Sequence, residues 1–203
     1  MRELRPLAVL AVACVASLLR PTPARACYNE VVRELSPVED IATAERDLSH
    51  GKLADATWRV RVRYPSIRSL GPDAPPLALR AQRIYALALV RANGMLDARE
   101  GWARWGNLEW ALETLRELDG KRPNEPRSQA DLAEARVKLP RTRASGVAVL
   151  ESLDRRDLLG SPFSYIALAS ARREVGDDGG VRAALRRCVA MSVDRARCQV
   201  EVW

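Results

Sequence analysis

The chain has 203 residues and a mass of 22.5 kDa, enough for one compact domain or an array of small repeats. Hydrophobic residues make up 47% and charged residues 29%, a globular balance that excludes wholesale disorder. The single histidine, His50, would have to serve any Ser-His-Asp, Cys-His or multi-histidine metal site. Because GxGxxG, GxxxxGKS/T and CxxC motifs are also absent from the sequence, we expect no cofactor and no metal.

The N-terminus has the pattern of a secretory signal peptide. Arg2 and Arg5 precede an apolar run at 7–19, and Ala24-Arg25-Ala26 supplies an Ala-x-Ala cleavage site. The apolar run is too short to span a membrane comfortably. We therefore predict a signal peptide over 1–26, a mature chain that begins at Cys27, and a periplasmic or secreted location.

The alternative for the N-terminus is a lipoprotein that is anchored to the membrane through Cys27. In a lipoprotein signal the cysteine follows the apolar run directly, whereas seven residues, two of them arginines, intervene here. Simple cleavage is therefore favoured, and we expect membrane association only if Cys27 is lipidated.

Export places the cysteines in a compartment that permits disulfides. Cys188 and Cys198 are close in sequence, so we predict a bridge that holds the tail, residues 193–203, against the last helix. The alternative is that Cys188 is a small buried hydrophobic residue.

Ala, Leu and Arg dominate the chain, which favours an all-α protein. Ser36-Pro37-Val38-Glu39 is a capping box that begins a helix, which Gly51 ends. A second helix is predicted over 53–63, and the two helices form a hairpin. The proline- and glycine-rich stretch 66–76 is predicted to be a linker. The apolar run 77–93 predicts the next helix, whereas 97–106 fits a short helix or a loop equally well.

A period of 35 residues runs through the second half of the chain. It links Leu115, Leu150 and Leu185, and it links two further sets: Leu118, Leu153 and Cys188, and Ala111, Gly146 and Val181. The segments 107–119, 142–154 and 177–191 are therefore predicted to be equivalent helices, and 129–139 and 162–175 the helices that precede the last two. A period of this length built from helix pairs indicates an α-solenoid.

These residues resemble the tetratricopeptide repeat family. Gly106 occupies the position of the turn glycine between its two helices, and Ala111, Leu115, Leu118 and Pro123 follow at the family's spacing. The middle unit departs from the pattern, with Arg141 and Gly146 in place of glycine and alanine. The resemblance covers 37–191. We predict five segments: the signal 1–26, an N-terminal segment with the first hairpin 27–65, the linker 66–76, the repeats 77–192 and the tail 193–203.

The resemblance also implies a binding surface. In the family the first helix of each unit lines a concave groove that takes a peptide or a partner helix. The groove positions so implied are Ser128, Asp131, Lys138, Phe163, Ser170 and Arg173, and the alternative for each is an ordinary solvated position. Trp102 and Trp105 are further candidate ligand anchors, because tryptophan is enriched at interface hot spots. The alternative for both is packing of 97–106 against the helices.

The function that we expect is an exported, non-catalytic scaffold for a protein or peptide partner. One alternative is an envelope hydrolase, which needs a cleft with two carboxylates or one carboxyl group with a raised pKa. Another is a polyanion or membrane-surface binder. We do not expect nucleic-acid binding, because acidic residues are interspersed throughout and removal of the signal leaves a net charge of only +4.

Overall fold

The computed structural model describes residues 36–96 and 101–198, with only the backbone of Gly101 and Trp102. The chain divides into two units between residues 34 and 35, and every helix described below belongs to the second. The predictions for the signal peptide, Cys27 and the Trp102 side chain lie outside the described residues. Within the described part all regular structure is helical, as predicted.

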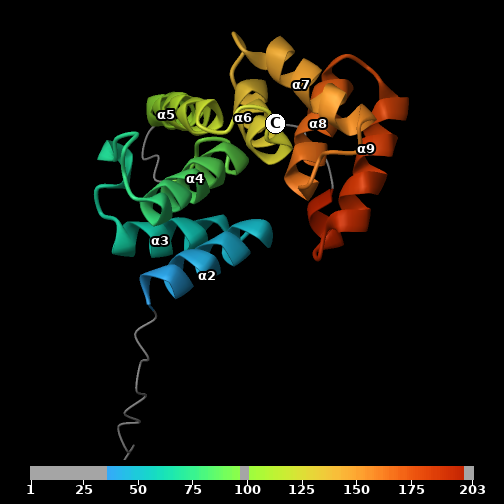
Figure 1. Cartoon of the computed structure of the whole chain (residues 1–203). Helices are drawn as coiled ribbons and strands as arrows, with labels where there is room; N and C mark the ends of the chain where they lie inside the picture. Colours follow the sequence, from blue (N-terminus) through green and yellow to red (C-terminus); the bar gives the residue numbers. More distant parts are fainter. Residues whose placement is uncertain (1–35, 97–100, 199–203) are drawn as a thin grey trace, which may run out of the picture. The chain divides into compact units, whose positions relative to one another are not determined.

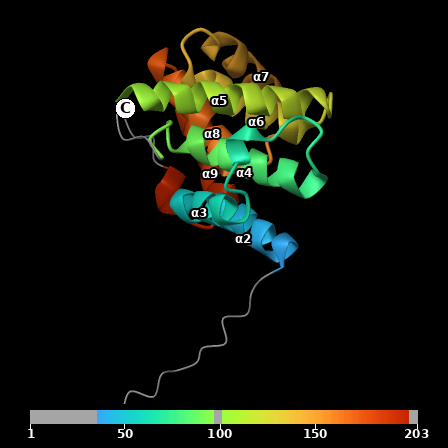
Figure 2. The same cartoon turned by 90° about the vertical axis from the view of Figure 1, so that its left-hand side faces the viewer.

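Eight α-helices pack as four sequential antiparallel pairs in this part of the chain (Figure 1). The leading helices, each the first of its pair, also contact one another in succession: α2 with α4, α4 with α6, and α6 with α8. The pairs are α2 (Pro37–Ser49) with α3 (Leu53–Arg63), α4 (Pro76–Arg91) with α5 (Gly101–Gly120), α6 (Pro126–Lys138) with α7 (Arg143–Arg155), and α8 (Pro162–Glu174) with α9 (Asp178–Met191). Figure 2 shows α4 beside α5 and α2 beside α3 from a second direction.

The two predicted Ser-Pro helix starts are confirmed, whereas α6 begins at Pro126, three residues before the predicted 129. Ser36 Oγ accepts a hydrogen bond from the Glu39 backbone N–H at 3.2 Å, and the Glu39 carboxylate accepts one from Ser36 N–H at 2.8 Å. Ser161 caps α8 by accepting from the Phe163 N–H at 3.2 Å. These side chains satisfy backbone donors that a helix N-terminus leaves without partners.

The turn glycine of the second pair is not the predicted one. Gly106 lies inside α5, which begins at Gly101. The turn after α4 instead uses Asn93 and Gly94, with φ of 54° and 75°. Asn107 ties this turn to α5, because its amide donates to the carbonyls of Gly94 and Leu96, each at 2.9 Å. The Ala-Arg-Trp stretch before Gly106 favours helix, and one exposed glycine does not interrupt it.

The segment 66–76 is more ordered than a simple linker. It contains a short 3-10 helix, η1 (Ile67–Ser69), and Ile67 is buried. The Gln82 amide of α4 donates to the Leu70 carbonyl at 3.1 Å. The segment therefore packs against α4.

The residues that the 35-residue period links lie on the trailing helices α5, α7 and α9. Leu115 and Leu150 are buried on α5 and α7, and Leu185 is half-buried on α9. The small-residue positions Ala111 and Gly146 are buried as well. Gly146 lies so close to α6 that an added Cβ would meet the Ala133 carbonyl oxygen at 2.9 Å. A small residue here therefore allows α6 and α7 to approach.

Helix α6 joins two hydrophobic clusters. Its Leu132 and Ala135, together with the C-cap residue Leu139, belong to the cluster formed with α2–α5. Its Ala130, Ala133 and Val137 belong to the cluster formed with α7–α9. The two apolar faces of α6 therefore make the two halves of this unit one packed structure.

The predicted disulfide is confirmed. Cys188 of α9 bonds Cys198, with their Cα atoms 5.7 Å apart. The bridge is consistent with an oxidising, extracytoplasmic compartment. It places Arg197 where its guanidinium donates to the Gly51 carbonyl at 2.9 Å, so the end of the described chain touches the α2–α3 turn. None of the described helices combines the length and the hydropathy that a membrane span requires.

Gly146→Ala tests the close approach of α6 and α7. The added methyl would push against the α6 backbone, so we expect a loss of about 1–3 kcal/mol in the free energy of unfolding, measured by urea denaturation. Gly106→Ala is the matched control, since a Cβ there meets nothing within 4 Å, and we expect a gain of up to about 1 kcal/mol. Equal effects of the two substitutions would contradict the packing.

Removing the bridge should release the tail from α9. In the Cys188→Ala/Cys198→Ala variant we expect a loss of about 2–3 kcal/mol, because the unfolded chain is no longer constrained. Thermal unfolding with and without reductant measures this effect. The wild type should become less stable on reduction, and the double variant should not respond. A reductant-insensitive wild type would show that the bridge contributes nothing to stability.

Candidate functional site

The four leading helices line one groove, which we call the inner groove. Its volume is about 530 Å³. Residues from every leading helix face it: Glu45 and Leu48 of α2, Arg83, Leu87 and Arg91 of α4, Arg127, Ala130 and Asp131 of α6, and Pro162, Phe163 and Ser164 of α8. Residues far apart in sequence therefore share one surface.

Two further cavities share lining residues with the inner groove. The cationic pocket, about 600 Å³, shares Glu45, Arg83, Glu125 and Arg127 with it and is also lined by residues of α4 and by Leu118 of α5. The end pocket, about 270 Å³, shares Ser49, Pro162 and Phe163 with the inner groove.

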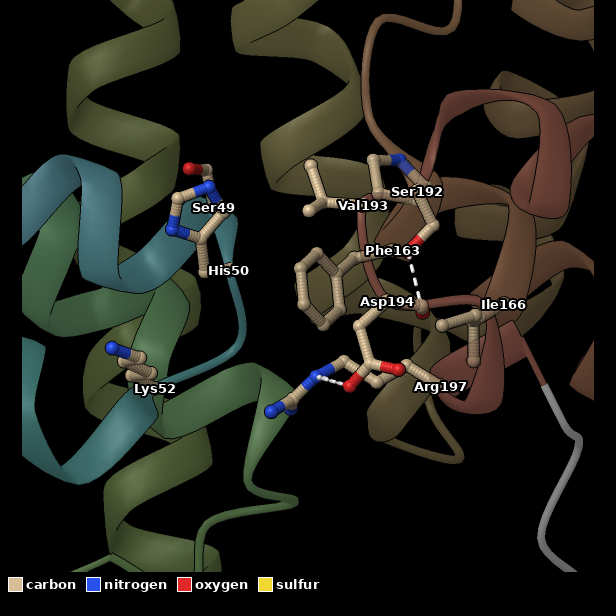
Figure 3. A pocket seen from close by; sticks show the side chains of 10 residues that line it. Ser49, His50, Lys52, Phe163, Ile166, Ser192, Val193, Asp194 and Arg197 are labelled. Carbon is tan, nitrogen blue, oxygen red and sulfur yellow. Dashed lines mark hydrogen bonds and ion pairs between the residues drawn. The ribbon is translucent and has the colours of Figure 1, made fainter.

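The end pocket lies between the α2–α3 turn and the segment after α9 (Figure 3). His50 and Lys52 come from the turn, and Val193 and Arg197 come from the facing segment. Asp194 accepts a hydrogen bond from Arg197 Nε at 3.0 Å. His50 is the C-cap of α2, a place where an imidazole needs no catalytic explanation.

Arg83 connects three leading helices along the inner groove. From α4 it donates to the Asp131 carboxylate of α6 at 2.6 Å. It also donates to the Glu45 carboxylate of α2 at 3.4 Å. Glu45 accepts further hydrogen bonds from Arg80 and from Arg127, the latter at 2.7 Å. A chain of arginine–carboxylate contacts thus runs from α2 to α6.

Arg91 makes the equivalent connection between α4, α6 and α8. It donates to both oxygens of Glu134, at 3.0 and 3.3 Å, and to Ser161 Oγ at 3.3 Å. Its guanidinium lies 4.2 Å from the centre of the Phe163 ring. The Ser164 hydroxyl donates to Glu134 at 2.6 Å. Both members of the ion pair are buried, with 7% and 3% of their side chains exposed, so the pair is shielded from water.

Burial changes the acidity of the groove carboxylates. Burial raises the pKa of Asp131 to about 6, an effect that Arg83 opposes and the nearby Glu134 reinforces. Burial would also raise the pKa of Glu45, but Arg80 and Arg127 outweigh it and hold that pKa below its usual value. At the other end of α6, burial lowers the pKa of Lys138.

Three of the predicted groove residues line these cavities. Ser128 lines the cationic pocket, and Asp131 and Phe163 line the inner groove. Asp131 is not a freely solvated groove residue, because it is 4% exposed and paired with Arg83.

The other predicted binding residues lie elsewhere. Lys138, Ser170 and Arg173 do not line the three cavities, although all three lie on leading helices. Trp105 is 44% exposed on the trailing helix α5, and the Arg104 guanidinium lies 5.2 Å from its ring centre. Their role in partner binding stays a prediction.

Sequence patterns alone did not indicate the groove residues outside α6 and α8. Arg83 and Arg91 interrupt the most apolar helix of the described chain, and Glu45 and Glu134 are their partners. An arginine within an otherwise buried helix requires an acidic partner. The arginines in the apolar run 77–93 are therefore the sequence signal that could have located these ion pairs.

Neither a metal site nor a relative identifies the groove. Among the described residues no group of three or more His, Cys, Asp or Glu side chains could hold a metal ion. No protein-family model matches the chain, and neither do any curated proteins or solved structures. Function therefore has to be inferred from the groove itself.

The raised pKa of Asp131 predicts a specific pH dependence of stability. Because this pKa is higher in the folded state than its ordinary 3.8, the contribution of Asp131 to the free energy of unfolding falls as the pH rises from about 4 to about 6. Asp131→Asn should therefore become more stable relative to the wild type, by about 1–3 kcal/mol, between those values.

Urea denaturation at about pH 4 and about pH 7 measures this difference. The same substitution at Asp73, an exposed position in the 66–76 segment, is the control for removing a carboxylate. A difference between the wild type and Asp131→Asn that stays constant with pH would contradict the raised pKa.

Proposed function

We propose that the protein is an exported helical-repeat scaffold that binds a segment of a protein or peptide partner in the inner groove. The observation that carries this proposal is that all four leading helices contribute side chains to one groove. A groove lined by successive helices suits an extended or helical segment, because each helix presents a separate contact site along its length.

The order of the contacts supports the repeat architecture. Each leading helix packs on the next, and the residues that the 35-residue period links lie on the trailing helices, with Leu115 and Leu150 buried and Leu185 half-buried. We infer from this a tetratricopeptide-like solenoid of short, divergent units. The confirmed disulfide supports the exported location that the N-terminal sequence predicts.

The second candidate function is an envelope hydrolase, and one observation favours it. Asp131 has a raised pKa beside the groove, and Glu134 lies three residues away on the same helix. A general acid or base must reach the substrate. Here Asp131 accepts a hydrogen bond from Arg83, and Glu134 accepts hydrogen bonds from Arg91 and Ser164. These contacts account for the presence of both buried carboxylates without a catalytic role. We therefore favour binding.

An activity assay separates the two functions. Purified protein is incubated with isolated cell-envelope glycan, and released reducing ends are counted for the wild type and Asp131→Asn. We expect no release by either protein. Release that depends on Asp131 would replace the scaffold proposal with the hydrolase.

Blocking the groove tests binding directly. Gly160 lines the inner groove, and a Cβ there meets nothing within 4 Å, so Gly160→Trp adds bulk without removing a contact. A random peptide library is selected on the wild type, and the affinities of the selected peptides are measured by fluorescence anisotropy. We expect Gly160→Trp to weaken these peptides at least roughly tenfold, since a blocked hot-spot contact costs this much or more.

Gly71→Trp is the matched control. Gly71 is exposed and lies outside the three cavities, and a Cβ added to it would meet nothing within 4 Å. Selected peptides should bind this variant as they bind the wild type. Peptides that bind both tryptophan variants equally, or a failure to select any peptide, would contradict the proposed groove.

A further inference from the structure

A fourth cavity, of about 310 Å³, is lined by residues of α5, α6 and α7. Figure 1 shows α6 between the other two helices, and α6 packs against both. Of the described residues that line this cavity, none lines the inner groove, the cationic pocket or the end pocket. We call it the polar pocket, because five of its eight lining residues are polar or charged: Asp119, Gln129, Arg136, Ser152 and Arg156. A polar cavity of this size suits a small molecule.

Asp119 of α5 lacks the contacts that would make its carboxylate stabilising. Its Oδ1 atom is buried and accepts no hydrogen bond from the described residues. A buried acceptor without a donor lowers the free energy of unfolding. Asp119 is also the next-to-last residue of α5, where a negative charge opposes the helix dipole. A ligand that donates a hydrogen bond to Oδ1 would account for a carboxylate at this place.

The basic side chains of the polar pocket also lack partners within the described part of the chain. Arg136 is half-buried on α6, and neither it nor Arg156, the C-cap of α7, forms an ion pair or a side-chain hydrogen bond there. The half-buried Arg83 and Arg172, by contrast, each donate to a carboxylate. Two guanidinium groups and one orphan carboxylate oxygen therefore line one cavity without neutralising one another.

These groups define the chemistry of a ligand. It must donate a hydrogen bond to Asp119 and accept hydrogen bonds from two guanidinium groups. Two arginines against one aspartate leave an excess of positive charge, which favours an anion. One guanidinium fork occupies both oxygens of a carboxylate, whereas a phosphate monoester has three terminal oxygens and accepts from both arginines. A hydroxyl group on the same molecule provides the donor.

We propose that the polar pocket binds a small phosphate monoester that carries hydroxyl groups, such as a sugar or polyol phosphate. Arg136 and Arg156 donate to its phosphate, and one of its hydroxyl groups donates to Asp119 Oδ1. Gln129 and Ser152 contact its remaining hydroxyl groups. The apolar lining residues, which contact its carbon skeleton, are Leu132, Val149 and Leu153. This site is separate from the groove in which we propose that a peptide binds.

Isothermal titration calorimetry of the purified protein tests the proposal. The probes are terminal phosphate esters of glycerol, ribose and glucose, with inorganic phosphate and glucose as partial ligands that lack the hydroxyl groups or the phosphate. We expect at least one ester to bind at millimolar concentration or below. It should bind at least roughly tenfold more tightly than either partial ligand, because a hydrogen bond to a charged group contributes about this factor.

Two kinds of variant separate the contacts. Arg136→Gln and Arg156→Gln should each weaken the ester roughly tenfold, and the exposed Arg156 provides a variant whose folding is not at risk. Arg155→Gln is the matched control, because Arg155 is an exposed neighbour that does not line the cavity.

Asp119→Ala should abolish the preference for the ester over inorganic phosphate. The midpoint of its urea denaturation should stay the same or rise, since the substitution removes a buried acceptor that has no donor. A purely structural aspartate would lower this midpoint. Glu117→Ala is the matched control, because Glu117 is an exposed carboxylate of α5 outside the cavity.

Three results would overturn the proposal. One is that no ester binds more tightly than inorganic phosphate. Another is that Arg155→Gln weakens the ester as much as Arg156→Gln does. The third is that Asp119→Ala keeps the preference for the ester. None of these results bears on the inner groove, which Gly160→Trp tests separately.

Discussion

The structure depends on how a stack of helices buries charged side chains. The Arg91–Glu134 pair is almost fully enclosed, and an uncompensated charge at either position would cost several kcal/mol. Arg91 must therefore face Glu134, which sets how α4 lies against α6, and Ser164 and Phe163 extend the same requirement to α8. Apolar packing alone would allow these helices to shift along one another. An ion pair that uses both carboxylate oxygens forms in only a few relative positions of the helices.

The same contacts determine the character of the groove. Arg83 repeats the arrangement between α2, α4 and α6, so the surface of the leading helices is a band of paired charges beside leucines and Phe163. In the inner groove acidic and basic side chains are equal in number, so the band carries no excess charge there. Around Glu45 five basic side chains line the cationic pocket against two acidic ones, so the band carries an excess of positive charge there. The side chains of the ion pairs therefore also line the groove in which we propose that a peptide binds.

The sequence predicts the helices well because their signals are local. Three of these signals are the Ser36 capping box, the Ser161 cap and the spacing of Cys188 and Cys198. Each depends on residues that are close in sequence, and all three are confirmed. The prediction of a turn at Gly106 was wrong because a glycine is compatible with both a turn and a helix interior. Only the tertiary contacts of Asn107 with Gly94 decide between the two. The groove could be predicted only in part, since its arginines depend on partners about 40 residues away along the chain.

The central claim is that the buried pair holds the leading helices in register, and a double-mutant cycle on Arg91 and Glu134 tests it most directly. Urea denaturation measures the free energy of unfolding of Arg91→Met, Glu134→Leu and the double variant. We predict that each single substitution costs about 3–5 kcal/mol, because each leaves a buried charge without its partner, and that the double variant costs far less than their sum. Additive costs would show that the two side chains act independently, and the account of the groove would then be wrong.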